Sequence, residues 1–126
     1  MALYSDTLLD HFGNPRNVGD LDPPAVRVEV TNPACGDILR LSVLFKDGRV
    51  AQARYKARGC TASIAAGSAL TELMLDKTAE ELARLGVADV ERAVGGLIPE
   101  SRHAAVLCVD ALRALLKAEK TRRTAN

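Results

Sequence analysis

Apolar and polar residues alternate in two stretches near the start of the chain. Every second residue from Val26 to Val30 is apolar, and the same alternation runs through residues 39–45. A period of two predicts half-buried β-strands. The dipeptide Asp47-Gly48 predicts a tight turn, because both residues tolerate positive φ. Residues 50–58 should therefore fold back as a third, antiparallel strand.

The apolar spacing becomes helical after residue 60. Residues 61–76 carry apolar residues at intervals of three and four, and most of them are small. Small side chains let a helix backbone approach its neighbour closely. Gly67, which costs about 1 kcal/mol relative to alanine in a helix, marks the expected contact. Shorter helices are predicted over residues 78–85 and 87–94, and a long one over residues 101–120, followed by a frayed tail.

A short helix is predicted before the strands. Leu8, Leu9 and Phe12 share one helical face, Ser5 is suited to cap its start, and Gly13-Asn14-Pro15 ends it. Strands and helices are thus segregated along the chain. This order predicts an α+β fold, in which a three-stranded antiparallel sheet has a short N-terminal helix and a C-terminal run of helices packed on one face.

The composition narrows the function classes. The chain has 126 residues, 48% of them hydrophobic, which suits a single domain over residues 1–126. Its formal charge of +1 gives no electrostatic reason to bind nucleic acid or anionic lipid. The longest apolar run, residues 104–109, is far shorter than a spanning helix, and the first six residues lack a signal pattern. We therefore expect a cytoplasmic protein with no nucleic-acid or membrane partner.

Two of the three cysteines lie where chemistry is expected. An odd number of cysteines in a chain with its own core indicates reduced thiols. Cys35 shares a turn with Asp37 outside any apolar run, which argues against an inert buried role. Cys60 stands at the start of the small-residue helix, where free N–H groups would face its sulfur and favour the thiolate. A packing role for Cys60 is the alternative.

The last predicted helix holds a histidine and the third cysteine. His103 lies in its first turn, off the apolar stripe, whereas Cys108 belongs to that stripe. Five residues correspond to about 140° around a helix, so the two side chains point in different directions. We expect Cys108 to be buried for structural reasons. His11, near the end of the first helix, is interpreted as a surface or capping histidine.

These residues predict one site, formed by Cys35, Asp37, Cys60 and His103. Their spacing alone is unspecific, because the chain has no CxxC pair and the contributing segments are far apart. Two thiolates, a carboxylate and an imidazole nevertheless suit Zn²⁺ or a labile iron site. The hard oxygen of Asp37 is expected to hold iron–sulfur chemistry less tightly than a further thiolate would.

Several motifs resemble the IscU/NifU/SufU family of iron–sulfur cluster assembly scaffolds. They are Tyr4-Ser5 followed by residues 10–19 (DHFGNPRNVG), the turn Ala34-Cys35-Gly36-Asp37, and Gly59-Cys60 leading into Ser63-Ile64-Ala65. The resemblance implies that Cys35, Asp37, Cys60 and His103 bind a transient [2Fe-2S] cluster, iron or zinc. It also implies a scaffold, not an enzyme, that takes sulfur from a cysteine desulfurase and passes clusters to apo iron–sulfur proteins.

The chain departs from the family pattern next to His103. Ala104 stands where the family usually has its third cysteine, and Cys108 could replace it only if the intervening helical turn were unwound or displaced. One alternative is therefore a zinc-binding module or sulfur acceptor that has lost cluster assembly. Another is a thiol hydrolase with Cys60 as nucleophile and His103 as base. The altered stretch at residues 97–101 argues against recognition by an Hsp70-type chaperone.

Overall fold

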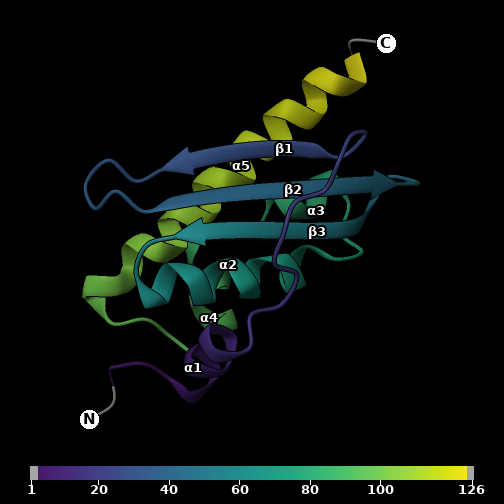
Figure 1. Ribbon diagram of the computed structural model, residues 1–126. Helices are drawn as coiled ribbons and strands as arrows, with labels where there is room; N and C mark the ends of the chain where they lie inside the picture. The colour runs from purple at the N-terminus through teal and green to yellow at the C-terminus, as the bar shows by residue number, and fades with distance from the viewer. Residues whose placement is uncertain (1–2, 125–126) are drawn as a thin grey trace.

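The computed structural model, which describes residues 3–124, has the predicted α+β arrangement (Figure 1). Its elements are α1 (Asp6–Gly13), β1 (Val26–Thr31), β2 (Ile38–Lys46), β3 (Arg49–Arg58), α2 (Thr61–Met74), α3 (Ala79–Ala83), α4 (Val87–Ala93), a 3₁₀ turn (Pro99–Ser101) and α5 (Arg102–Thr124). The three-stranded antiparallel sheet, the short N-terminal helix and the later helices confirm the predicted fold class.

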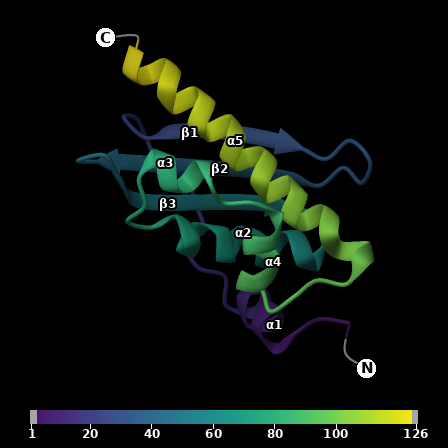
Figure 2. The ribbon, with the colours of Figure 1, turned by 180° about the vertical axis from the view of Figure 1, so that it is seen from behind.

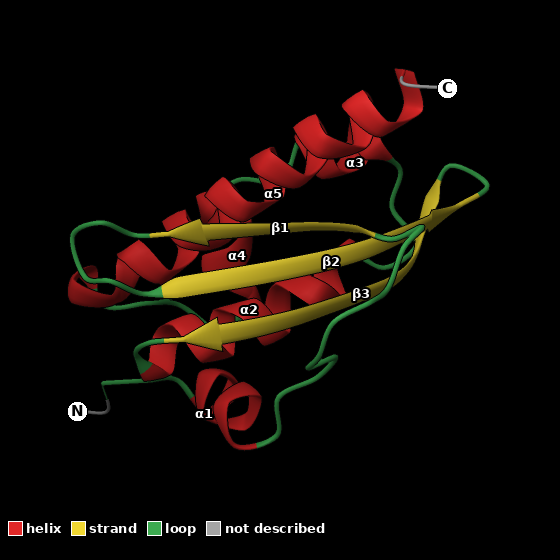
Figure 3. Ribbon diagram, turned by 45° about the horizontal axis from the view of Figure 1, so that its top comes forward, coloured by secondary structure: helices red, strands yellow, loops and turns green. Residues whose placement is uncertain are grey.

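The central strand of the sheet fixes which face is covered. The strand order is β1-β2-β3, and Leu41 of β2 lies opposite Val28 on one side and Tyr55 on the other. Leu39, Leu41 and Val43 are buried, as the alternation predicted. A one-residue slip would turn all three away from the core, so burial fixes the register. Seen from behind, α2, α3, α4 and α5 cover this face (Figure 2), and Figure 3 shows the same layering from another angle.

Helix α2 lies very close to the sheet, as its small residues predicted. Gly67 faces the ring of Tyr55, and a Cβ at position 67 would lie 2.5 Å from Tyr55 Cδ2. The Tyr55 hydroxyl donates a 2.7 Å hydrogen bond to the carbonyl of Ile64 on the same helix. Because this close packing fixes α2 relative to β3, it also fixes the position of Cys60 at the start of the helix.

The interpretation of His11 as a surface or capping residue is wrong. His11 is only 6% exposed, and its Nδ1 lies 2.7 Å from Oγ of Ser68 on α2. The same Ser68 oxygen accepts a 2.9 Å hydrogen bond from the backbone N–H of Arg16. The pair therefore anchors α1 and the following connection to α2. The sequence pattern of α1 alone gave no sign of a buried partner in another helix.

The last helix extends further than predicted. Residues 121–124, expected to fray, continue α5, whereas residues 125 and 126 of that tail lie outside the described part of the chain. Arg122 donates hydrogen bonds of 2.7 and 2.9 Å to the carboxylate of Glu119, one turn earlier, which supports the final turns. Within residues 3–124, no helix combines the length and apolar character needed to cross a membrane.

Replacing Gly67 by alanine should destabilise the chain. The added methyl group would overlap the Tyr55 ring, and overpacking of this kind costs about 1–3 kcal/mol. We expect this cost to exceed the gain in helix propensity from glycine to alanine, which is about 1 kcal/mol. Gly13→Ala is the matched control, because a Cβ at that helical position has no other atom within 4 Å. Urea unfolding should show a lower midpoint for Gly67→Ala only; an unchanged midpoint would contradict the close contact.

The stability of the fold should decrease as the pH falls through 6.5. Burial and the nearby Arg16 lower the pKa of His11 below its usual value of 6.5, so the folded chain protonates this ring less readily than the unfolded chain does. Below 6.5 the unfolded chain binds more protons, and the free energy of unfolding falls by at most about 1.4 kcal/mol per pH unit for one such group.

The pH effect of His11 can be isolated with a variant that cannot titrate. His11→Asn keeps a hydrogen-bonding group near the Nδ1 position, where Ser68 lies. Urea unfolding of both chains from about pH 7.5 to about pH 5.5 gives the pH dependence of stability. The wild-type chain should lose more stability across this range than the variant. Equal losses would contradict the assignment to His11.

Candidate functional site

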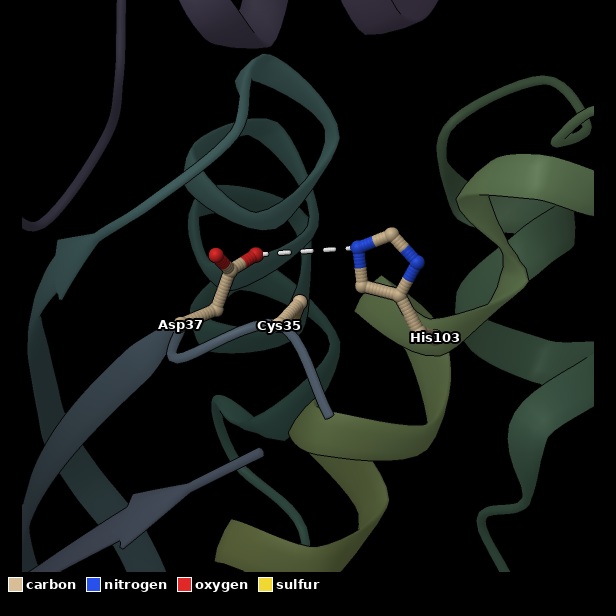
Figure 4. A group of neighbouring side chains, drawn as sticks. All are labelled: Cys35, Asp37 and His103. Carbon is tan, nitrogen blue, oxygen red and sulfur yellow. Dashed lines mark ion pairs between the residues drawn. The ribbon is translucent and has the colours of Figure 1, made fainter. Parts of the chain in front are cut away.

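Side chains from three distant segments meet at one end of the sheet. The β1–β2 loop supplies Cys35 and Asp37, the start of α2 supplies Cys60, and the first turn of α5 supplies His103. Figure 4 shows Asp37 and His103 pointing toward each other beside Cys35. One ligand atom from each of these three residues lies within 4.8 Å of the others. The fold thus brings together the residues that their sequence spacing left apart.

The carboxylate of Asp37 is the centre of this cluster. Asp37 is 6% exposed, and its Oδ2 lies 3.2 Å from Sγ of Cys60 and accepts a 3.4 Å hydrogen bond from the Cys60 backbone N–H. Gly59 makes room for this carboxylate, because a Cβ at that position would overlap it; its φ of +150° also disfavours other residues. Asp37 therefore lies against the start of α2, whose first turn contains no acidic residue of its own.

Asp37 is held as an anion. Burial on its own would raise the pKa of this carboxyl, but hydrogen bonds from Ser63, Cys60 and Cys35 outweigh the burial and lower the pKa below its usual value. A negative oxygen next to a thiol and an imidazole attracts a cation. The donor set therefore has the charge as well as the atoms that a metal site requires.

The backbone orients the imidazole of His103. Its Nδ1 lies 3.0 Å from the carbonyl oxygen of Glu100, which can only accept a hydrogen bond. Nδ1 therefore carries a proton, so Nε2 is the ring nitrogen that can present a lone pair to the site. Nε2 lies 3.5 Å from Cys60 Sγ and 3.6 Å from Asp37 Oδ2. A hydrogen bond from the remote ring nitrogen is the usual way in which proteins orient a metal-binding histidine.

The sulfur of Cys60 faces the site instead of the helix. Cys60 is the N-cap residue of α2, but its side chain does not cap the backbone, contrary to the prediction that the sulfur would face free N–H groups. The oxygen of Asp37 takes that place, since it accepts from the Cys60 N–H. A carboxylate is a stronger hydrogen-bond acceptor than a sulfur atom and carries a full charge, which explains why Asp37 accepts this hydrogen bond in place of the Cys60 sulfur. Cys35 is exposed, so it has no packing role in the core.

The family model described as the NifU-like N terminal domain matches residues 3–126. The chain belongs to this family. The match covers every segment that contributes to the site and confirms the resemblance found in the sequence motifs.

Relatives of this NifU-like domain are similar over nearly the whole chain. The iron-sulfur cluster assembly scaffold protein IscU 1 of Archaeoglobus fulgidus is 40% identical over 111 residues, which span 88% of this chain and 72% of the relative. The iron-sulfur cluster assembly enzyme IscU of Drosophila melanogaster is 35% identical over 133 residues, which span 100% of this chain and 86% of the relative. The crystal structure of a nitrogen-fixing NifU-like protein (N-terminal) from Brucella abortus has a TM-score of 0.61 over 94% of this chain and 83% of its own; at 24% identity, it supports the fold alone.

Cys108 of this NifU-like domain is a core residue. It is 1% exposed, and burial raises the pKa of its thiol to about 12. Helix α5 is continuous from Arg102, so the turn between Ala104 and Cys108 is not unwound. Both observations confirm the predicted structural burial. The structure therefore lacks the unwound turn that Cys108 would need in order to replace the thiolate expected from the family resemblance at position 104.

The structure adds one residue, Ser63, to which no role was assigned from the sequence. Ser63, in the first turn of α2, is 2% exposed, and its hydroxyl donates a 2.7 Å hydrogen bond to Oδ2 of Asp37. Its partner Asp37 is 26 residues away in sequence, so the contact depends on the fold. The sequence signals of Ser63 were its place in the motif that follows Gly59-Cys60 and its spacing of three residues from that candidate ligand cysteine, on the same turn of the helix.

Thiol alkylation should distinguish the site cysteines from the core cysteine. The folded chain treated with iodoacetamide should gain two adducts, at Cys35 and Cys60, whereas Cys108 should react only after unfolding in urea. Intact mass and peptide mapping give the number and position of adducts. The Cys108→Ala variant is the control and should show two adducts in both conditions. Modification of Cys108 in the folded chain at the rate of Cys35 would contradict its burial.

Proposed function

We propose that this NifU-like domain is a scaffold that assembles iron–sulfur clusters and passes them on, with Cys35, Asp37, Cys60 and His103 as the ligands. The observation that carries the proposal is the convergence of one oxygen, one nitrogen and one sulfur on a single point. Asp37 Oδ2, His103 Nε2 and Cys60 Sγ lie 3.2 to 3.6 Å from one another. Groups that share a metal converge in this way.

The same geometry argues against a thiol hydrolase. In a nucleophile–histidine–carboxylate triad the carboxylate orients the imidazole from the nitrogen opposite the nucleophile. Here Asp37 and Cys60 both face Nε2 of His103, while Nδ1 is bonded to the backbone. The three groups are therefore arranged around a common centre and not along a relay, which favours a binding role over catalysis.

The mixed ligand set suits a cluster that must leave again. A [2Fe-2S] cluster needs four protein ligands, two on each iron, and thiolates are the ligands it prefers. With Cys35 and Cys60 as its only thiolates, the site relies on the harder oxygen of Asp37 and the imidazole of His103 for the rest. We therefore expect the cluster to be held less tightly than by three thiolates. The cluster is cargo, and loose binding favours its transfer to apo iron–sulfur proteins.

We propose that sulfur arrives as a persulfide on a cysteine desulfurase. The exposed Cys35 is the accessible acceptor. Its thiolate attacks the outer persulfide sulfur, the S–S bond of the donor breaks, and the donor cysteine leaves as a thiolate, so that Cys35 becomes the new persulfide. Two electrons from an external reductant then release sulfide. The cytoplasm, where free thiols stay reduced, is the compartment in which we place this chemistry.

Anaerobic reconstitution tests the proposal. The chain is incubated with ferrous iron and either sulfide or a desulfurase with cysteine and reductant, and cluster formation is followed by visible absorption. We expect the wild-type chain to form a cluster and to pass it to an apo-ferredoxin. Cys35→Ala and Cys60→Ala should lose the cluster absorption, because each removes one of the two thiolate ligands.

Cys108→Ala is the matched control for this experiment, since it makes the same chemical change in the core. It should form and transfer the cluster as the wild-type chain does. Loss of the cluster in this variant would mean that Cys108 replaces the missing thiolate and that the proposed ligand set is wrong. Uptake of one Zn²⁺ with no cluster in the wild-type chain would contradict the scaffold role and favour a zinc-binding module.

A further inference from the structure

Ser63 contacts two candidate ligands that come from different segments. Its Oγ lies 2.7 Å from Oδ2 of Asp37, in the β1–β2 loop, and 3.4 Å from Sγ of Cys60, at the start of its own helix. With 2% of its surface exposed, Ser63 is shielded from solvent that could replace these contacts. The hydroxyl therefore joins the loop and the helix at the point where their ligand atoms meet.

The direction of each hydrogen bond follows from the chemistry of the groups. An ionised carboxylate can only accept, so the single hydroxyl proton of Ser63 goes to Asp37. The oxygen of Ser63 keeps lone pairs toward the Cys60 thiol, whose single hydrogen lies within reach of both Ser63 Oγ and Asp37 Oδ2. Gly59 lies against the carboxylate, where it leaves room for the carboxyl group but offers no polar side chain. Ser63 is thus the side-chain hydroxyl that sets the orientation of Asp37.

We propose that Ser63 is a positioning residue for this site, which holds the Asp37 carboxylate and the Cys60 sulfur in the arrangement that receives the metal. The inference rests on the proposed function, because it takes Asp37 and Cys60 as ligands. Hydrogen bonds to a ligating carboxylate fix its orientation before binding, and losing such an outer partner typically lowers metal affinity about 10- to 100-fold. Ser63 itself need not touch the metal.

The test uses Co²⁺ alone as the probe metal. The affinity of each chain is measured by competition with a chelator, and the sulfur-to-cobalt charge-transfer band and the d–d bands report the ligand geometry. Ser63→Ala removes only the hydroxyl and should weaken Co²⁺ binding about 10- to 100-fold and shift the d–d bands. Ser63→Thr, which keeps a hydroxyl, should recover most of the affinity and the wild-type spectrum.

Ser68→Ala is the matched control. Ser68 is a fully buried serine of the same helix, and its hydroxyl contacts His11 and Arg16 instead of the site. It should leave Co²⁺ affinity and spectrum unchanged, and urea unfolding of all variants gives their stability. Equal loss of affinity in Ser63→Ala and Ser68→Ala would overturn the inference, because the effect would then come from helix stability. Wild-type affinity and bands in Ser63→Ala would overturn it as well, and so would a folded Ser63→Thr that recovers neither.

Failure of the inference can be told apart from failure of the proposed function. Cluster formation and transfer by the wild-type chain test the scaffold role and do not depend on Ser63 variants. If the wild-type chain transfers clusters and Ser63→Ala binds Co²⁺ normally, the scaffold role stands and the role of Ser63 is wrong. If the wild-type chain forms no cluster but Ser63→Ala weakens Co²⁺ binding, the scaffold role is wrong, and Ser63 still positions the ligands of a metal site.

Discussion

The site depends on one buried carboxylate placed against the start of a helix. Asp37 belongs to the loop between two strands, yet its Oδ2 accepts from the backbone of Cys60 and the hydroxyl of Ser63. Burying a charge costs free energy unless the charge is hydrogen-bonded. Moving the β1–β2 loop away from α2 would break these hydrogen bonds, so the buried charge of Asp37 keeps the loop in place. The hydrogen bonds within the loop, such as that from the Asn32 N–H to the Asp37 carbonyl, fix its shape, and the side-chain contacts of Asp37 hold it against the start of α2.

This arrangement requires that α2 itself be fixed. The packing of Gly67 against the Tyr55 ring places the helix close to β3, and the Ser68 hydroxyl ties it to His11 on the other side. Protein interiors are close-packed, so a helix held on two sides has little freedom to shift. Gly67 and Ser68 therefore help to determine the position of the site, although they contact Tyr55 and His11 instead of its candidate ligands.

The sequence predicted well what depends on local patterning. Period-two alternation gave the strands, the small-residue spacing gave α2 and the role of Gly67, and turn and helix-start positions singled out Cys35 and Cys60. What it missed depends on contacts across the chain. The burial of His11 required a serine in another helix, and the role of Ser63 required the loop to bring Asp37 to it. Neither partner follows a sequence period, because polar contacts between elements depend on how the elements pack.

The site is drawn from segments that are separated by 23 residues between Asp37 and Cys60 and by 43 residues between Cys60 and His103. An unfolded chain cannot keep these groups together, so whatever binds here binds the native state almost exclusively. By mass action, a bound ligand stabilises the folded chain. This stabilisation grows with the ratio of the ligand concentration to the dissociation constant of the site. Each release of the proposed cluster would return the protein to its less stable form, so its resistance to proteolysis and heat would rise and fall with the supply of iron and sulfur.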